Sequence, residues 1–129
     1  DILLIATKTT LENNKLIAKY KNSGIKFKAL NKLAPLIDEN LDEIEKIYPY
    51  LKKELKGNFK AIVLGCTHYM AVENLLKDIY KDAKIFDSSN GVARRLLSFV
   101  QERNLGYQVQ IYCEDDKMRA KLWWYYLNR

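Results

Sequence analysis

ILLIA at residues 2–6 and AIVLG at residues 61–65 are the two stretches that decide the fold. Each is an apolar run without a charged residue, and such runs are typical of parallel strands that are buried on both faces. Each is followed by a polar segment, TKTT at residues 7–10 and CTH at residues 66–68. We therefore predict two strands of a parallel sheet, with these polar segments at its carboxyl edge.

The rest of the chain alternates between helical and extended patterns. Apolar residues at helical spacing predict helices at residues 9–20, 40–55, 70–80, 91–102 and 116–127. Further strands are predicted at residues 25–30, 83–86 and 107–112. Because strands and helices alternate with short connections, we predict an α/β fold with a mainly parallel sheet flanked by helices.

Bulk composition is that of an ordinary globular protein. The 129 residues suffice for one domain or for one lobe of something larger, with 48% hydrophobic and 29% charged residues. No apolar run approaches the roughly 18 residues needed to span a bilayer, so we expect no membrane partner. Residues 1–6 do not match a signal peptide, and the chain starts with Asp1 instead of Met. We therefore expect a piece of a longer chain.

Charge and cysteine content argue against two further kinds of site. The 22 basic and 16 acidic residues give a net charge of +6, but the lysines are scattered along the polar faces of predicted helices. This pattern favours a solvated surface over a nucleic-acid groove. Cys66 and Cys113 form no CxxC pair, and with a single histidine they cannot build a usual zinc site. We expect no metal, no disulfide framework and a reducing, cytoplasmic setting.

Cys66 is the most informative residue because it directly follows a predicted strand. Open α/β sheets bind ligands at that edge. A helix that begins shortly afterwards would point its positive dipole end at the thiol, which would favour the thiolate and lower the pKa of Cys66. Thr67 adds a hydroxyl, and His68 can exchange a proton near neutrality. A lone cysteine at a strand end is more often inert, but the Cys-Thr-His triplet makes a functional role an equal alternative.

Four segments resemble bacterial glutamate racemases, in the order of that family. LGCTHY at residues 64–69 is similar to the segment around the family's second catalytic cysteine. IATKTTL at residues 5–11 resembles a strand-end segment with two substrate-contacting threonines, which map to Thr7 and Thr10. APLID at residues 34–38 resembles Val-Pro-Leu-Val-Glu, and FDS at residues 86–88, with Val-Ala downstream, resembles the segment that leads back into the first lobe. The resemblance therefore covers nearly the whole chain.

The resemblance implies cofactor-independent racemisation of L-glutamate to D-glutamate for peptidoglycan synthesis, cell-wall biogenesis and cell shape. One thiolate removes the α-proton and an opposite thiol returns a proton to the other face. Cys66 matches one of these two thiols, with His68 as its proton-transfer group and Thr67 as a substrate contact. Thr7 and Thr10 would hold the substrate's carboxylate or ammonium group.

The chain also departs from the family pattern. The Asp-Ser and Cys-Asn-Thr segments of the family's first lobe are absent, and Cys113 lies in the wrong segment to replace the other cysteine. Asp38 stands where the family has glutamate, which makes it the candidate supporting carboxylate, one methylene shorter. Met70-Ala71 replaces Pro-Leu. The resemblance implies that residues 1–86 form the second lobe, and that residues 87–129 return to complete a first lobe that is otherwise missing.

Several alternatives stay open at this point. The chain could be an inactive binding or remnant module with the racemase fold, an aspartate racemase, or, on charge alone, a nucleic-acid module. WWYY at residues 123–126 either packs the last helix down or forms a partner surface, and a homo-oligomer is compatible with both. With one catalytic cysteine, the isolated chain is expected not to racemise glutamate.

Overall fold

The computed structural model describes residues 1–12, 14–99, 112 and 114–127. The chain divides into two compact units, residues 1–88 and 89–129, which are considered separately. The predicted strand at residues 107–112 lies outside the described residues except for Tyr112, and Cys113 lies outside them as well.

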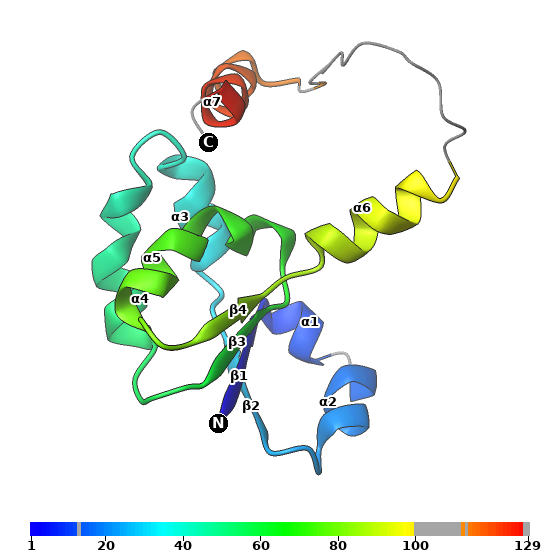
Figure 1. The fold of residues 1–129 in the computed structure, drawn as a ribbon. Helices are drawn as coiled ribbons and strands as arrows, with labels where there is room; N and C mark the ends of the chain where they lie inside the picture. The colour runs from blue at the N-terminus through cyan, green and yellow to red at the C-terminus, as the bar shows by residue number, and fades with distance from the viewer. Residues whose placement is uncertain (13, 100–111, 113, 128–129) are drawn as a thin grey trace. The chain divides into compact units, whose positions relative to one another are not determined.

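A parallel sheet forms the centre of the first unit (Figure 1). Its strands are β1 (Ile2–Ala6), β2 (Ile25–Ala29), β3 (Ala61–Leu64) and β4 (Lys84–Phe86), in the order β2-β1-β3-β4. All three pairings are parallel, so the predicted α/β class is confirmed. The two stretches that decide the fold are the two inner strands, and being paired on both sides explains their apolar composition.

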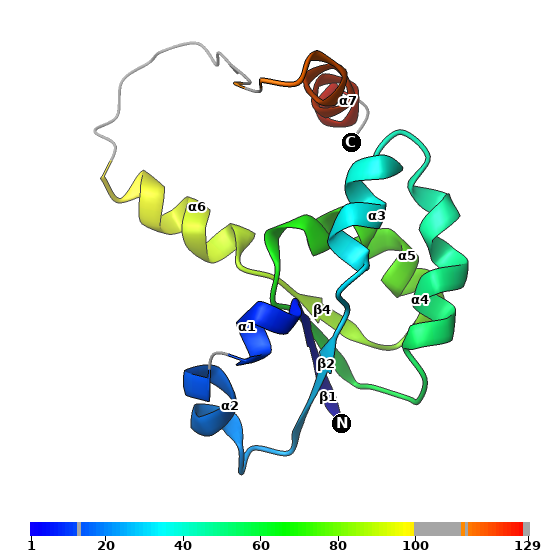
Figure 2. The same ribbon diagram turned by 180° about the vertical axis from the view of Figure 1, so that it is seen from behind.

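Helices cover both faces of this sheet (Figures 1 and 2). The connection after β1 leads to β2, which lies on one side of β1 in the sheet. The connection after β2 leads back past β1 to β3, which lies on its other side. Because such crossovers are right-handed, these two connections place their helices on opposite faces of the sheet. One face carries α1 (Lys8–Glu12) and α2 (Asn14–Tyr20). The other carries α3 (Leu33–Glu39), η1 (Ile44–Ile47), α4 (Tyr48–Glu54), η2 (Thr67–Val72) and α5 (Glu73–Ile79).

The predicted helix boundaries are only partly confirmed. Within the helix predicted at residues 9–20, the described residues are helical as α1 and α2, and residue 13 between them lies outside the described residues. The helix predicted at residues 40–55 begins as a 3-10 turn at Ile44, and its α-helical part starts at Tyr48. Pro49 lies in the first turn of α4, where its missing N–H costs nothing, whereas within a longer helix it would remove a hydrogen bond.

The helix α3 was not predicted, although its residues were quoted in the resemblance. Leu33 and Ile37 are four residues apart and both are buried, as expected for the inner face of a short helix. Its seven residues are too few for a clear periodic signal.

The core lies between the sheet and the helices α3, α4 and α5. The side chains that are completely buried there come from strands and helices alike: Ile5, Leu33, Leu51, Ile62, Tyr69, Val72 and Leu76. Tyr69 is the largest of them, and it comes from the polar segment after β3. Packing against this core therefore fixes the segment that contains Cys66.

The second unit contains α6 (Ser89–Leu97) and α7 (Asp116–Leu127). The bounds of α7 match the helix predicted at residues 116–127. The apolar side chains Val92 and Leu96 of α6 are more than half exposed, as is Phe99 just beyond it. Within the described part of the chain, no helix combines the length and apolarity needed to cross a bilayer.

Candidate active site at the carboxyl edge of the sheet

Cys66 and Thr7 are brought together by the pairing of β1 with β3. Ile5 is in register with Leu64, so the residues that follow the two strands lie at the same edge of the sheet. The Gly65 N–H donates to the Ile5 carbonyl at 2.8 Å. A Cβ at Gly65 would lie 3.0 Å from both the Ile5 oxygen and the Ala6 Cβ. Glycine therefore permits the close approach that brings Cys66 to the end of β1.

The backbone after Cys66 differs from the expectation. Cys66 is extended (φ −144°, ψ 138°) and precedes the 3-10 helix η2, whereas the α-helix begins only at Glu73. The helix predicted at residues 70–80 is α-helical only from Glu73, and the helical segment that follows Cys66 begins instead with the 3-10 helix η2, of which Cys66 is the N-cap. A tight 3-10 turn instead carries Thr67 and His68 close to the thiol.

At this edge the imidazole of His68 lies between a thiol and a carboxylate, with one ring nitrogen near each. The Cys66 Sγ lies 3.8 Å from His68 Nδ1, and His68 Nε2 lies 3.5 Å from Asp38 Oδ1. Cys66 is partly buried, while the side chains of His68 and Asp38 are 47% and 44% exposed. A carboxylate on one ring nitrogen orients the imidazole and leaves the other nitrogen to exchange a proton with the thiol. Asp38 thus reaches the site despite its shorter side chain.

The predicted threonines occupy the same edge but play different local roles. The hydroxyls of Thr7 and Thr10 lie 2.9 Å apart, and the Thr10 N–H lies 3.3 Å from the Thr7 hydroxyl. Thr7 therefore also caps the start of α1. Thr67 is exposed as the first residue of η2. Each of the three presents a hydroxyl that is capable of binding a polar ligand.

Tyr69 supports this site, and the sequence analysis assigned it no role. Its side chain is completely buried, and its hydroxyl donates to the Leu30 carbonyl at 2.9 Å. Burial raises the pKa of Tyr69, and the nearby charges of Cys66 and Tyr50 raise it further. The signal that could have revealed it is an aromatic residue that directly follows the polar triplet at residues 66–68.

Comparison with known proteins links this geometry to a family. No model of a protein family matches the chain. Over 104 residues it is 38% identical to a glutamate racemase of Clostridium kluyveri, covering 74% of this chain. Glutamate racemases of Clostridium botulinum and Aquifex aeolicus are 34% and 27% identical, covering 81% and 87% of this chain. The chain belongs to the glutamate racemase family.

The match covers only part of each relative. This racemase-family chain spans 40% of the Clostridium kluyveri protein, 44% of the Clostridium botulinum protein and 46% of the Aquifex aeolicus protein. The crystal structure of the glutamate racemase isoform RacE1 from Bacillus anthracis matches with a TM-score of 0.62, over 75% of this chain and 40% of that one. At 24% identity this likeness shows the fold, and it agrees with the parallel sheet.

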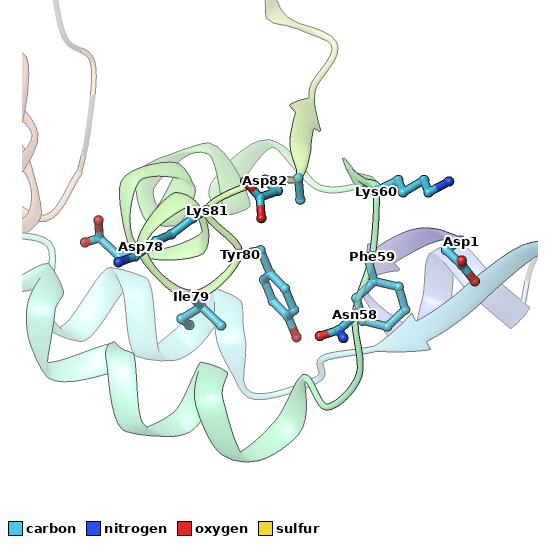
Figure 3. A pocket seen from close by; sticks show the side chains of 10 residues that line it. Asp1, Asn58, Phe59, Lys60, Asp78, Ile79, Tyr80, Lys81 and Asp82 are labelled. Atoms are coloured by element: carbon cyan, nitrogen blue, oxygen red, sulfur yellow. The ribbon is translucent and has the colours of Figure 1, made fainter.

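Figure 3 shows a hollow in this racemase-family chain whose lining does not include Cys66. Its volume is about 510 Å³, and its lining includes Asp1, Lys60 and Ala83, which immediately precede β1, β3 and β4. It is therefore at the amino edge of the sheet, opposite the candidate site. Among the described residues, no group of three or more His, Cys, Asp or Glu side chains is placed to hold a metal ion.

Proposed function

We propose that this chain supplies one side of a glutamate racemase active site, with Cys66 as one of its two acid–base thiols. The observation that carries the proposal is the line of Cys66, His68 and Asp38 at the carboxyl edge of the sheet. The relatives that support it are named glutamate racemases. The proposed reaction is the cofactor-independent interconversion of L- and D-glutamate.

The proposed chemistry is a proton exchange across the α-carbon of the substrate. The Cys66 thiolate takes the α-proton, and the electron pair left on carbon delocalises into the adjacent carboxylate. A thiol on the opposite face then gives its proton to that carbon, so Cys66 ends as the thiol and the opposite residue as the thiolate. A further turnover in the same direction requires that Cys66 loses this proton and that the opposite thiolate gains one. The His68 Nδ1, 3.8 Å from Sγ, returns Cys66 to its starting protonation state.

The remaining residues at the edge are proposed to hold the substrate and the imidazole. Asp38 keeps the His68 ring turned so that Nδ1 faces the thiol. The hydroxyls of Thr67, Thr7 and Thr10 donate to the substrate's carboxylate or accept from its ammonium group. These hydrogen bonds stabilise charge as it develops during the reaction.

The second thiol is proposed to come from the part of the protein that the relatives have beyond this chain. The chain spans less than half of those relatives, which is consistent with a missing lobe. We further propose that residues 1–86 form one lobe and that residues 87–129 return to the other. The exposed apolar side chains of α6 support this assignment because a second lobe would cover them. The complete protein would supply D-glutamate for peptidoglycan synthesis and cell shape in the cytoplasm.

Activity assays test this proposal directly. The 129-residue chain alone should form no detectable D-glutamate from L-glutamate, while the full-length parent should be active. In the parent, Cys66→Ser should lower kcat by about 10²- to 10⁴-fold, the usual contribution of a positioned acid–base group. Cys113→Ser serves as the control and should keep the parental rate.

Three results would contradict the proposal. Turnover by the 129-residue chain would remove the need for a second thiol from elsewhere. An undiminished rate in Cys66→Ser would remove Cys66 from the chemistry. If the parent racemised aspartate but not glutamate, the proposed substrate would be wrong.

A further inference from the structure

Tyr69 differs from its neighbours in the motif that follows β3. Thr67 and His68 are exposed, whereas the Tyr69 side chain is completely buried. Its hydroxyl crosses from η2 to the backbone that connects β2 to α3, where it donates to the Leu30 carbonyl. Among the described residues, this hydrogen bond links a side chain of the segment at residues 66–69 to that connection.

The Leu30 connection is itself held on several sides. The Leu30 N–H donates to the Ala6 carbonyl at 2.9 Å, and the Leu33 N–H donates to the Leu30 carbonyl at 3.1 Å. The start of α3 is therefore tied to the end of β1 and, through Tyr69, to η2.

This arrangement bears on the contact between His68 and Asp38. His68 lies in η2 and Asp38 lies in α3, and the two side chains are 3.5 Å apart and nearly half exposed. An exposed pair of this kind contributes little to holding two elements together. The buried hydrogen bond from Tyr69 joins η2 to the connection that leads directly into α3, and it is the stronger constraint, since its donor has no water to replace a lost acceptor.

We propose that Tyr69 is a positioning residue, whose hydrogen bond to Leu30 holds α3 against η2 so that Asp38 faces His68. It acts on the imidazole through Asp38 and does not touch the thiol chemistry itself. The inference rests on the proposed function only for the role of the His68 imidazole in proton transfer. The contact between Asp38 and His68 can be measured without any turnover.

Nuclear magnetic resonance of the 129-residue chain tests the inference, because His68 is its single histidine. Asp38→Asn gives the reference shift of the His68 ring signals when the carboxylate charge is lost. Tyr69→Phe removes only the hydroxyl and should move the same signals in the same direction. The Leu30 carbonyl keeps its bond from Leu33, so the variant leaves it with a donor.

Tyr80→Phe is the matched control. The Tyr80 hydroxyl also donates to a backbone carbonyl, that of Leu55 at 2.6 Å, and Tyr80 is 9% exposed. It belongs to the hollow at the opposite edge, so its loss should leave the His68 signals in place. The proposal is overturned if Tyr69→Phe leaves the His68 signals unchanged, or if both tyrosine variants move them equally.

A second measurement needs no variant. In the unmodified chain the Tyr69 hydroxyl proton should give a slowly exchanging signal, since it is buried and bonded. A Tyr69 hydroxyl that exchanges as fast as those of exposed tyrosines would overturn the proposal even if Tyr69→Phe did not fold.

Discussion

Replacement of Gly65 by alanine tests how the sheet brings Cys66 to the end of β1. The added Cβ would lie 3.0 Å from the Ile5 oxygen, 3.0 Å from the Ala6 Cβ and 3.2 Å from a methyl group of Leu4. The Ile5 oxygen also accepts the Gly65 N–H at 2.8 Å, so it cannot retreat without lengthening that bond. Two of these neighbours belong to the backbone or lie directly on it, and a side-chain rotation cannot relieve the contact.

The expected loss of stability in Gly65→Ala is that of an overpacked site in a protein core. Such insertions cost about 1–3 kcal/mol, and we expect Gly65→Ala to lower the free energy of unfolding by about that amount. Urea titration followed by far-UV circular dichroism measures it, as a lower midpoint at an unchanged slope. The displaced strand end should also change the rate at which iodoacetamide alkylates Cys66 in a Cys113→Ser background.

Gly91→Ala is the control for this substitution. Gly91 lies in α6, and nothing is within 4 Å of the position its Cβ would take. Alanine there should raise helix stability by roughly 0.5–1 kcal/mol, because glycine is the more flexible residue in the unfolded chain. Unfolding of Gly65→Ala at the wild-type midpoint, with Cys66 alkylated at the wild-type rate, would refute the close-approach argument.

Two further predictions concern pH. Burial raises the pKa of Tyr69 and Tyr80, so both keep their protons in the folded chain when unfolded tyrosine ionises near about pH 10. Their contribution to stability is therefore complete below about pH 10 and is lost above it, by up to about 1.4 kcal/mol per pH unit for each. Urea titrations in alkaline buffers measure this, and the double Tyr→Phe variant should flatten the slope; an equal slope would contradict it. Asp115 accepts the N–H groups of Lys117 and Met118 at 2.8 and 3.0 Å, which lowers its pKa. Its stabilisation of α7 should be present above the ordinary carboxyl pKa and lost as pH falls through the lowered one, as amide shifts of those two residues would report. Asp115→Ala should abolish that pH response, and its persistence would rule out the cap.

The order of the strands could be predicted only in part. An apolar run that is buried on both faces is a local signal, so the sequence identified β1 and β3. That these two pair with each other, with β2 and β4 outside them, depends on crossovers that no local pattern contains.

Helix boundaries were the weakest part of the prediction, and Pro49 shows why. Apolar spacing continues through residues 40–55, but the proline sets the start of α4 within that range. The spacing reports which face is buried, whereas the boundary depends on the hydrogen bonds of individual residues.

The sequence by itself determined that Cys66, Thr67 and His68 follow a buried strand and so lie at an edge where ligands bind. That information is local, because strand direction and the residues after the strand are adjacent in the chain. Only the tertiary structure decided that Asp38 meets His68 and that Tyr69 reaches Leu30. Those contacts join η2 to α3 and to the connection before it, segments that are far apart in the chain. They form only because both segments pack on the same face of one sheet.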